Sequence, residues 1–251
     1  MSTINTNSRQ FRLTAIWERY NSLIIWFLLV AYLGLASFLV TVVFPVQFVD
    51  RSQSGLFELQ AVIAIGVMGL IGVWLSMRTG FPNAWDARVS NKQRLFIPII
   101  TGLLLGSLFL ATDLITGMSR LQEEHLNIQS TDVAFPASIF VYSAAAIFVE
   151  VVYRLLIIPL LLGMISIFVR SQSAREKVFW MLAILTSIIE PLTNTAASQF
   201  LAPLALIFVL VQSFSANFLQ AVFFRRYGFV AAILLRVAFY IPTHVIGSFL
   251  K

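Results

Sequence analysis

Four charged side chains stand inside long apolar stretches, where they can take part in acid–base chemistry or form ion pairs. They are Glu150, Arg154, Glu190 and Arg236. A charge at the centre of a membrane helix costs about 2.5 to 3.5 kcal/mol on insertion scales, so each needs compensation. A buried carboxylate can act as a general base, whereas two glutamates facing two arginines can form a structural ion-pair network. The sequence leaves both interpretations open.

Helical spacing predicts which polar groups share a depth in the membrane. Counting 1.5 Å of rise per residue puts Glu150 and Arg236 in the inner half, and Glu190 and His244 in the outer half. Arg236, Tyr240 and His244 recur every fourth residue, so they form one polar stripe of a helix. We therefore expect two polar groups at different depths.

Two prolines lie close to the residues of the predicted outer group, Glu190 and His244. Pro191 and Pro242 have no amide hydrogen, so each leaves the carbonyl four residues earlier without its helical partner, and a polar pocket is expected there. The candidate catalytic residues are Glu150, Glu190 and His244, and the supporting residues are Arg154, Asn194, Arg236 and Tyr240. No metal site is predicted, because the estimated depths separate Glu150 from the other two and the chain has no cysteine.

Seven apolar stretches carry these side chains. A hydrocarbon core of about 30 Å requires roughly 20 apolar residues per helix, and most of the stretches approach or exceed that length. They are 23–44, 56–77, 95–114, 136–169, 178–193, 200–224 and 229–250. The pattern predicts an all-α, multi-pass transmembrane bundle. The fourth stretch is overlong, so we expect it to tilt, to kink near Pro159 or to extend beyond the membrane.

Basic residues predict the orientation. Outside the apolar stretches, twelve Lys and Arg fall on the side of the N-terminus and three on the other side. By the positive-inside rule the N-terminus is cytoplasmic. The predicted organisation is a cytoplasmic segment 1–22, a three-helix membrane part 23–134 and a four-helix core 135–251.

Composition excludes a soluble protein. The chain is 59% hydrophobic and only 11% charged, so its apolar surplus has to face lipid. The net charge of +6 is interpreted as an orientation signal, so no nucleic-acid partner is expected. No cofactor is predicted. The lipid bilayer is the first expected partner, and a bacterial-type cytoplasmic membrane is the expected location.

Three stretches between residues 135 and 249 carry motifs in a characteristic order. They are Val149-Glu150-Val-Val-Tyr-Arg154, then Ser187-Ile-Ile-Glu190-Pro-Leu-Thr-Asn194, then the run from Asn217 to Tyr240 that contains Phe-Phe-Arg-Arg-Tyr-Gly. This order resembles the CPBP family of intramembrane proteases, which includes the CAAX prenyl proteases and the Abi bacteriocin-immunity proteins. The family pattern is Glu-Glu-x-x-x-Arg, Phe-x-x-x-His and His-x-x-x-Asn or Asp.

The resemblance implies a glutamate and histidines that activate water for peptide cleavage inside the bilayer. Here Val149 stands for the first family Glu, Arg236 for a His and Tyr240 for Asn or Asp. These substitutions favour lost or rewired catalysis, with an interior polar site that binds a membrane peptide or a prenylated peptide. The alternatives are an active intramembrane peptidase with Glu190 as base, and a membrane transporter or channel.

Overall fold

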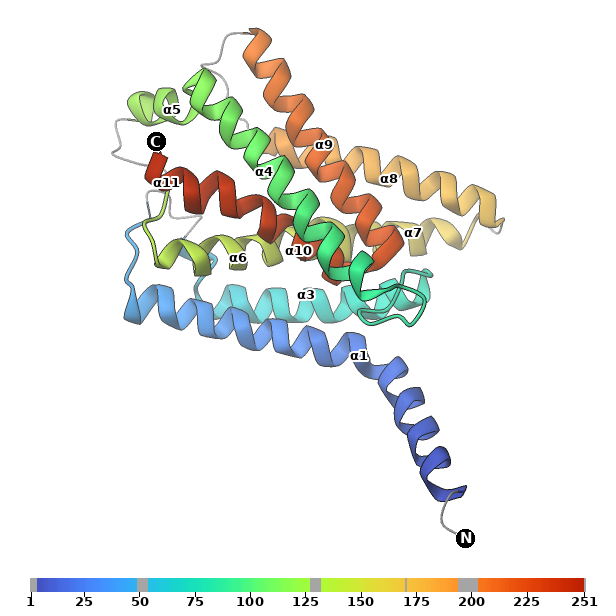
Figure 1. Cartoon of the computed structure of the whole chain (residues 1–251). Coiled ribbons are helices and arrows are strands. Elements are labelled where there is room, and N and C mark those ends of the chain that lie inside the picture. Colours follow the sequence, from blue (N-terminus) through green and yellow to red (C-terminus); the bar gives the residue numbers. More distant parts are fainter. Residues whose placement is uncertain (1–3, 49–53, 127–131, 170, 194–202, 251) are drawn as a thin grey trace.

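The computed structural model describes residues 4–48, 54–126, 132–169, 171–193 and 203–250, with the backbone alone for 4–19, 122, 125, 126, 193 and 203–205. All regular structure in these ranges is helical, so the predicted all-α class is confirmed. The helices lie side by side in one bundle (Figure 1).

Six helical stretches are long and apolar enough to cross a membrane. The first stretch begins at Tyr20 of α1 (Ile4–Phe38) and ends with η1 (Leu39–Val43), the second is α3 (Leu59–Arg78), and the third joins η2 (Lys92–Phe96) to α4 (Ile97–Thr116). The fourth stretch is α6 (Ala137–Glu150), followed by η3 (Val151–Ile157) and α7 (Ile158–Ser166). The fifth begins at Leu206 of α9 (Pro203–Tyr227), and the sixth is α10 (Phe229–Tyr240), followed by η5 (Ile241–Ile246) and α11 (Gly247–Leu250). They correspond to six of the seven predicted spans. The chain is therefore an integral, multi-pass membrane protein.

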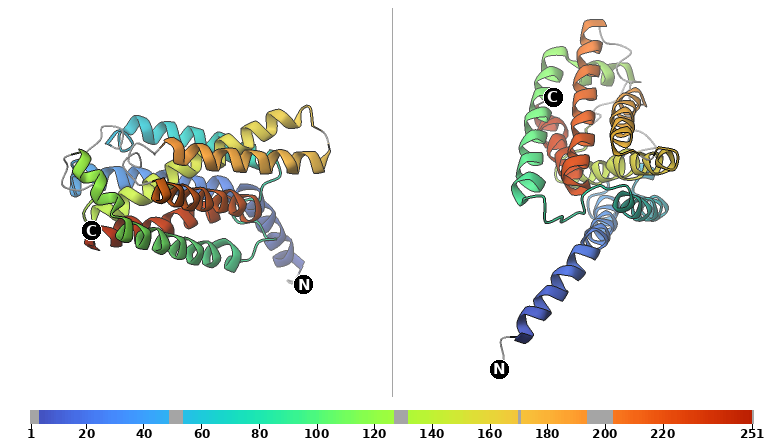
Figure 2. Two further views of the ribbon diagram at one scale, coloured as in Figure 1. Left: turned by 90° about the horizontal axis from the view of Figure 1, so that it is seen from above. Right: turned by 90° about the vertical axis from the view of Figure 1, so that its right-hand side faces the viewer.

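The remaining predicted span, 178–193, belongs to α8 (Gln172–Thr193). This helix falls outside the six because its first two turns and Glu190 carry charges. Its outer face is nevertheless apolar, since Met181, Ile188 and Leu192 are 61%, 43% and 55% exposed. Figures 1 and 2 show α8 running along the bundle beside α7 and α9. Its apolar part is about 24 Å long by helical rise, slightly shorter than a typical hydrocarbon core.

Helix α10 is central to the bundle, where it packs against α4, α6 and α9. Two glycines of α4 allow close approach of the α10 backbone. A Cβ atom at Gly102 would lie 2.2 Å from the carbonyl oxygen of Leu235, and one at Gly106 would lie 2.3 Å from that of Phe239. Small residues at such a spacing let membrane helices pack backbone to backbone. This contact fixes the position of Arg236, which points from α10 into the interior.

Wide π-helical turns interrupt the spans close to prolines. The turn η2 ends two residues before Pro98, η3 ends two residues before Pro159, and η5 contains Pro242. Proline lacks an amide hydrogen and its ring crowds the carbonyl four residues earlier, so the helix must widen or bend nearby. A kink near Pro159 is one of the three alternatives predicted for this overlong stretch, and the π-helical irregularity found there lies in the turn that carries Arg154.

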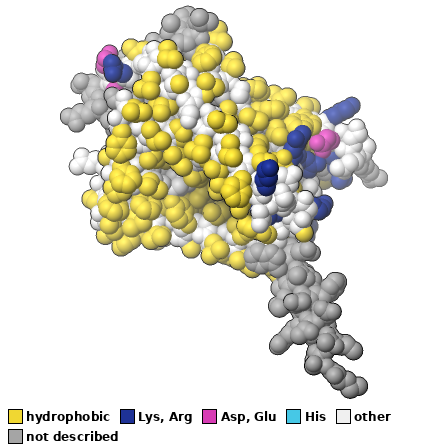
Figure 3. All heavy atoms as spheres, in the orientation of Figure 1, with side chains coloured by type: hydrophobic (Ala, Val, Ile, Leu, Met, Phe, Trp, Pro, Cys, Tyr) yellow, Lys and Arg dark blue, Asp and Glu magenta, His cyan; other side chains and the backbone are white. Residues whose placement is uncertain are grey.

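Basic side chains gather at one end of the molecule, the end predicted to be cytoplasmic (Figure 3). The loop between α3 and α4 is held there by the buried guanidinium of Arg94, which donates to the carbonyls of Asp86 and Val89. Arg88 donates two hydrogen bonds to the carboxylate of Asp86, at 3.0 and 2.6 Å. These bonds lower the pKa of Asp86 below its ordinary value.

Candidate functional site

The four charged residues selected from the sequence meet in the interior of the bundle, and we call them the ion quartet. Glu150 ends α6, Arg154 lies one turn later in η3, Glu190 lies in α8 and Arg236 lies in α10. Helices that are far apart in the sequence therefore each contribute one or two of the four charges. The convergence of Glu150 with Arg236, predicted from depth, is confirmed.

Each arginine of the quartet contacts both glutamates. Arg236 donates from Nε to Glu150 Oε1 at 2.6 Å, and its Nη2 lies 2.6 Å from Glu190 Oε1. Arg154 donates from Nη1 to the other oxygen of Glu190, and its Nε lies 3.9 Å from Glu150 Oε2. Two negative and two positive charges make the quartet formally neutral.

Helix α9 completes the quartet with two amide side chains. Asn217 Oδ1 accepts from Nη2 of Arg154 and from Nη2 of Arg236, both at 2.7 Å. Its backbone carbonyl also accepts from Arg154 at 3.0 Å, and Gln220 Oε1 accepts from Arg236 at 2.5 Å. These acceptors satisfy guanidinium donors that the carboxylates do not reach, which is what a charge cluster in a low-dielectric interior requires.

The quartet is enclosed by the bundle. Its four side chains are only 1–6% exposed. A carboxylate that serves as general base must be able to take a proton from water, and guanidinium groups cannot act as bases at all. Both oxygens of Glu190 are bound to arginines, so the arrangement favours a structural role. Glu150 Oε2 and Arg154 Nε lack a hydrogen-bond partner among the described residues, and they face each other.

The prediction that Glu190 shares the depth of His244 is wrong. Glu190 lies at the depth of Glu150 and binds the two arginines, not the histidine. The depth estimate placed the cytoplasmic boundary of the membrane at residue 178. In the structure the α7–α8 hairpin extends beyond the cytoplasmic ends of the neighbouring helices (Figures 1 and 2). Helix α8 therefore reaches the bundle centre at a later residue than expected if all helices entered the membrane at the same plane.

His244 instead belongs to a second group, the outer cluster of Asp132, Tyr142 and His244. His244 Nδ1 lies 2.9 Å from Asp132 Oδ1, and Tyr142 donates to the same oxygen at 3.2 Å. The imidazole stacks on the Tyr142 ring with centroids 4.3 Å apart. The Asp132 side chain is 5% exposed and that of His244 is 35% exposed. A carboxylate on Nδ1 orients the ring, as in many histidine sites.

Tyr240 lies between the two groups. Its hydroxyl accepts from Arg236 Nη1 at 3.3 Å, and its ring packs edge-on against His244 at 5.2 Å. Asn194, a predicted supporting residue, lies outside the described residues. Within the described part of the chain, no three His, Cys, Asp or Glu side chains are close enough together to hold a metal ion.

Sequence reasoning missed four partners: Asn217, Gln220, Asp132 and Tyr142. A signal existed for the first two, because polar amides are uncommon inside a membrane span and these stand three residues apart on one helical face. The partners of Asp132 could not be predicted, because it precedes an apolar stretch in a loop and the path of a loop leaves no periodic trace in the sequence. Tyr142 resembled any other aromatic residue of an apolar helix.

Comparisons with known proteins assign no family. No protein-family model matches the chain, and no curated protein and no solved structure matches it.

Proposed function

We propose that this protein is a CPBP-like membrane protein that binds a ligand without hydrolysing it. Three positions that the resemblance aligns with the family's motif residues are Glu150, Arg154 and Arg236. Glu150 contacts both arginines, and both arginines donate to Asn217 Oδ1, so the three positions lie in a single buried cluster. A protein that shares the family's scaffold should bring these motif positions together. Their proximity here supports the proposed family relationship.

One observation supports the proposed loss of hydrolysis. Glu190, the alternative base, is bound by a guanidinium at each carboxylate oxygen and is almost fully buried. A water molecule would have to displace an arginine to reach it, which would strand an uncompensated charge in the interior. We therefore assign the quartet the role of joining α6, α8, α9 and α10, while ligand binding takes place elsewhere on the bundle.

Peptide cleavage tests this proposal. The purified protein, reconstituted in lipid nanodiscs, is incubated with a prenylated peptide and separately with a transmembrane peptide, and products are measured by mass spectrometry. We expect no cleavage above protein-free nanodiscs for the wild type or for Glu190→Gln. Cleavage by the wild type that disappears in a folded Glu190→Gln protein would refute the proposal and assign Glu190 as the base.

A further inference from the structure

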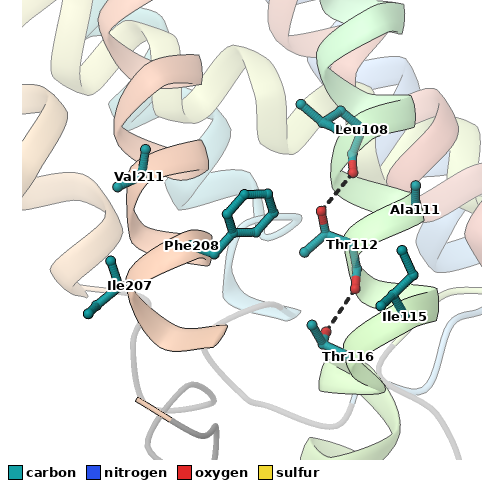
Figure 4. A pocket seen from close by; sticks show the side chains of 8 residues that line it. All are labelled: Leu108, Ala111, Thr112, Ile115, Thr116, Ile207, Phe208 and Val211. Carbon is teal, nitrogen blue, oxygen red and sulfur yellow. Dashed lines mark hydrogen bonds between the residues drawn. The ribbon is translucent and has the colours of Figure 1, made fainter. Parts of the chain in front are cut away.

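An apolar groove opens between α4 and α9, away from the ion quartet (Figure 4). Its volume is about 620 Å³. Eight residues line it, among them Leu108, Thr112, Ile115 and Thr116 on α4 and Phe208 and Val211 on α9. In Figure 4, the Phe208 ring projects from α9 into the space towards Thr112.

The polar atoms of the groove wall are already used. Thr112 donates to the carbonyl of Leu108 and Thr116 donates to that of Thr112, both at 2.9 Å. Thr112 Oγ1 also accepts from Gln212 at 2.9 Å. The lining residues carry no charge, so a ligand receives mainly apolar contacts there. A hydrocarbon chain suits such a wall better than a polar substrate does.

The surroundings of the groove restrict the source of its occupant. Ile115 is 85% exposed, and Leu108 and Ile207 are 52% and 58% exposed. These residues belong to two membrane-spanning helices, so their exposed surface faces lipid. The occupant therefore enters from the bilayer.

Size distinguishes a lipid chain from a partner helix. A helix about 10 to 12 Å wide with its side chains occupies roughly 1,000 Å³ over only two turns. The groove is smaller than this, but it lies within the range of roughly 300–1,000 Å³ that is typical of small-ligand cavities. A single hydrocarbon chain is thus the better fit.

A basic residue follows the outer end of the groove along the chain. Helix α4 ends at Thr116, and Arg120 follows in the first turn of α5 (Met118–Leu126), where it is exposed to solvent. A guanidinium at this interface can bind a phosphate. We propose that the groove holds one acyl chain of a membrane phospholipid, with the phosphate at Arg120; this rests on the proposed binding function and names its ligand.

Lipid retention tests the inference. Native mass spectrometry counts the phospholipids that stay on the protein when it is released from nanodiscs of defined phospholipid composition. Thr116→Phe places a ring in the groove, and Leu104→Phe is the matched control because Leu104 lies on the same helix, is 67% exposed and is absent from the groove wall. Arg120→Gln removes the headgroup contact, with the exposed Arg88→Gln at the opposite end as its control.

We expect the wild type and both controls to retain one phospholipid, and Thr116→Phe and Arg120→Gln to retain several-fold less. Thermal unfolding establishes that each variant is folded. A phospholipid carrying a photoreactive acyl chain should also label residues 206–212 of the wild type, which requires no variant. Equal retention by Thr116→Phe and the wild type, labelling elsewhere only, or a second protein chain in the groove would overturn the inference. Peptide cleavage would refute the proposed function but would not alter the retention result.

Discussion

The ion quartet and the outer cluster use similar chemical groups in different surroundings. In the quartet, two glutamates and two arginines are almost fully buried and are joined by Asn217 and Gln220. In the outer cluster, one carboxylate meets one imidazole whose side chain is about a third exposed. The first region is therefore enclosed by the bundle, whereas the second is open to its surroundings through His244.

This difference indicates where each group contributes. Breaking a buried ion network leaves an uncompensated charge in a low-dielectric interior. In a partly exposed pair, the group that remains can hydrogen-bond to water instead of its lost partner. The quartet should therefore govern the stability of the whole bundle. The outer cluster should fix only the segment before α6 to the end of the last span.

Removal of one quartet arginine should produce the largest loss. Arg236→Met leaves Glu150 and Glu190 with Arg154 alone, and we expect it to lower the free energy of unfolding by about 3 to 5 kcal/mol. Thermal unfolding in detergent measures this. The exposed Arg226→Met is the control and should change little. A similar small change in both variants would mean that the quartet is not stabilising.

Packing at the α4–α10 contact should have the next largest effect, because it positions Arg236. Gly106→Leu forces a side chain against the backbone of Phe239, and we expect a loss of about 1 to 3 kcal/mol. Gly34→Leu is the matched control, since nothing lies within 4 Å of a Cβ atom there. Unfolding temperatures compare the two, and equal values would contradict the close helix contact.

The outer cluster should respond less than the quartet. We expect His244→Gln or Asp132→Asn to cost about 1 kcal/mol, the size of one ordinary hydrogen bond. The double variant should cost scarcely more than either single variant, because both remove the same contact. A loss as large as that of Arg236→Met would remove the distinction between the two regions.

The smallest effect concerns acid stability at the cytoplasmic loop. Because the pKa of Asp86 is lowered in the folded protein, its contribution is present above the unfolded value of about 3.9 and is lost as pH falls through the folded pKa. Asp86→Asn should remove this part of the acid sensitivity. Arg88 is 82% exposed, so we expect less than about 1 kcal/mol, measured by unfolding between pH 5 and pH 2.

The sequence was sufficient to predict the helical class, six of the seven expected membrane-crossing helices and the convergence of Glu150 with Arg236. These follow from local rules: apolar length, helical rise and the energetic cost of a lone charge in lipid. The same rules were misleading for Glu190, because they assume that neighbouring helices start at one plane. The α7–α8 hairpin departs from that plane (Figure 1).

These local rules could not predict the hydrogen-bond partners that loops and amide side chains supply. Asp132 reaches His244 from the segment before α6, a contact between residues 112 positions apart. Asn217 binds two arginines from different helices, and its role depends on the rotation of α9 about its own axis. Helix rotation and loop path are set by tertiary packing, and neither is encoded in the periodicity of a single segment.

A double-mutant cycle between Glu150 and Arg236 tests the central claim most directly. Unfolding free energies are measured for Glu150→Gln, Arg236→Met and the double variant. We predict that the double variant is destabilised by less than the sum of the two single variants, with a coupling of about 0.5 to 3 kcal/mol, because Glu190 and Arg154 remain as a neutral pair. Losses that simply add would show that the two residues act independently, and this would contradict a stabilising ion quartet.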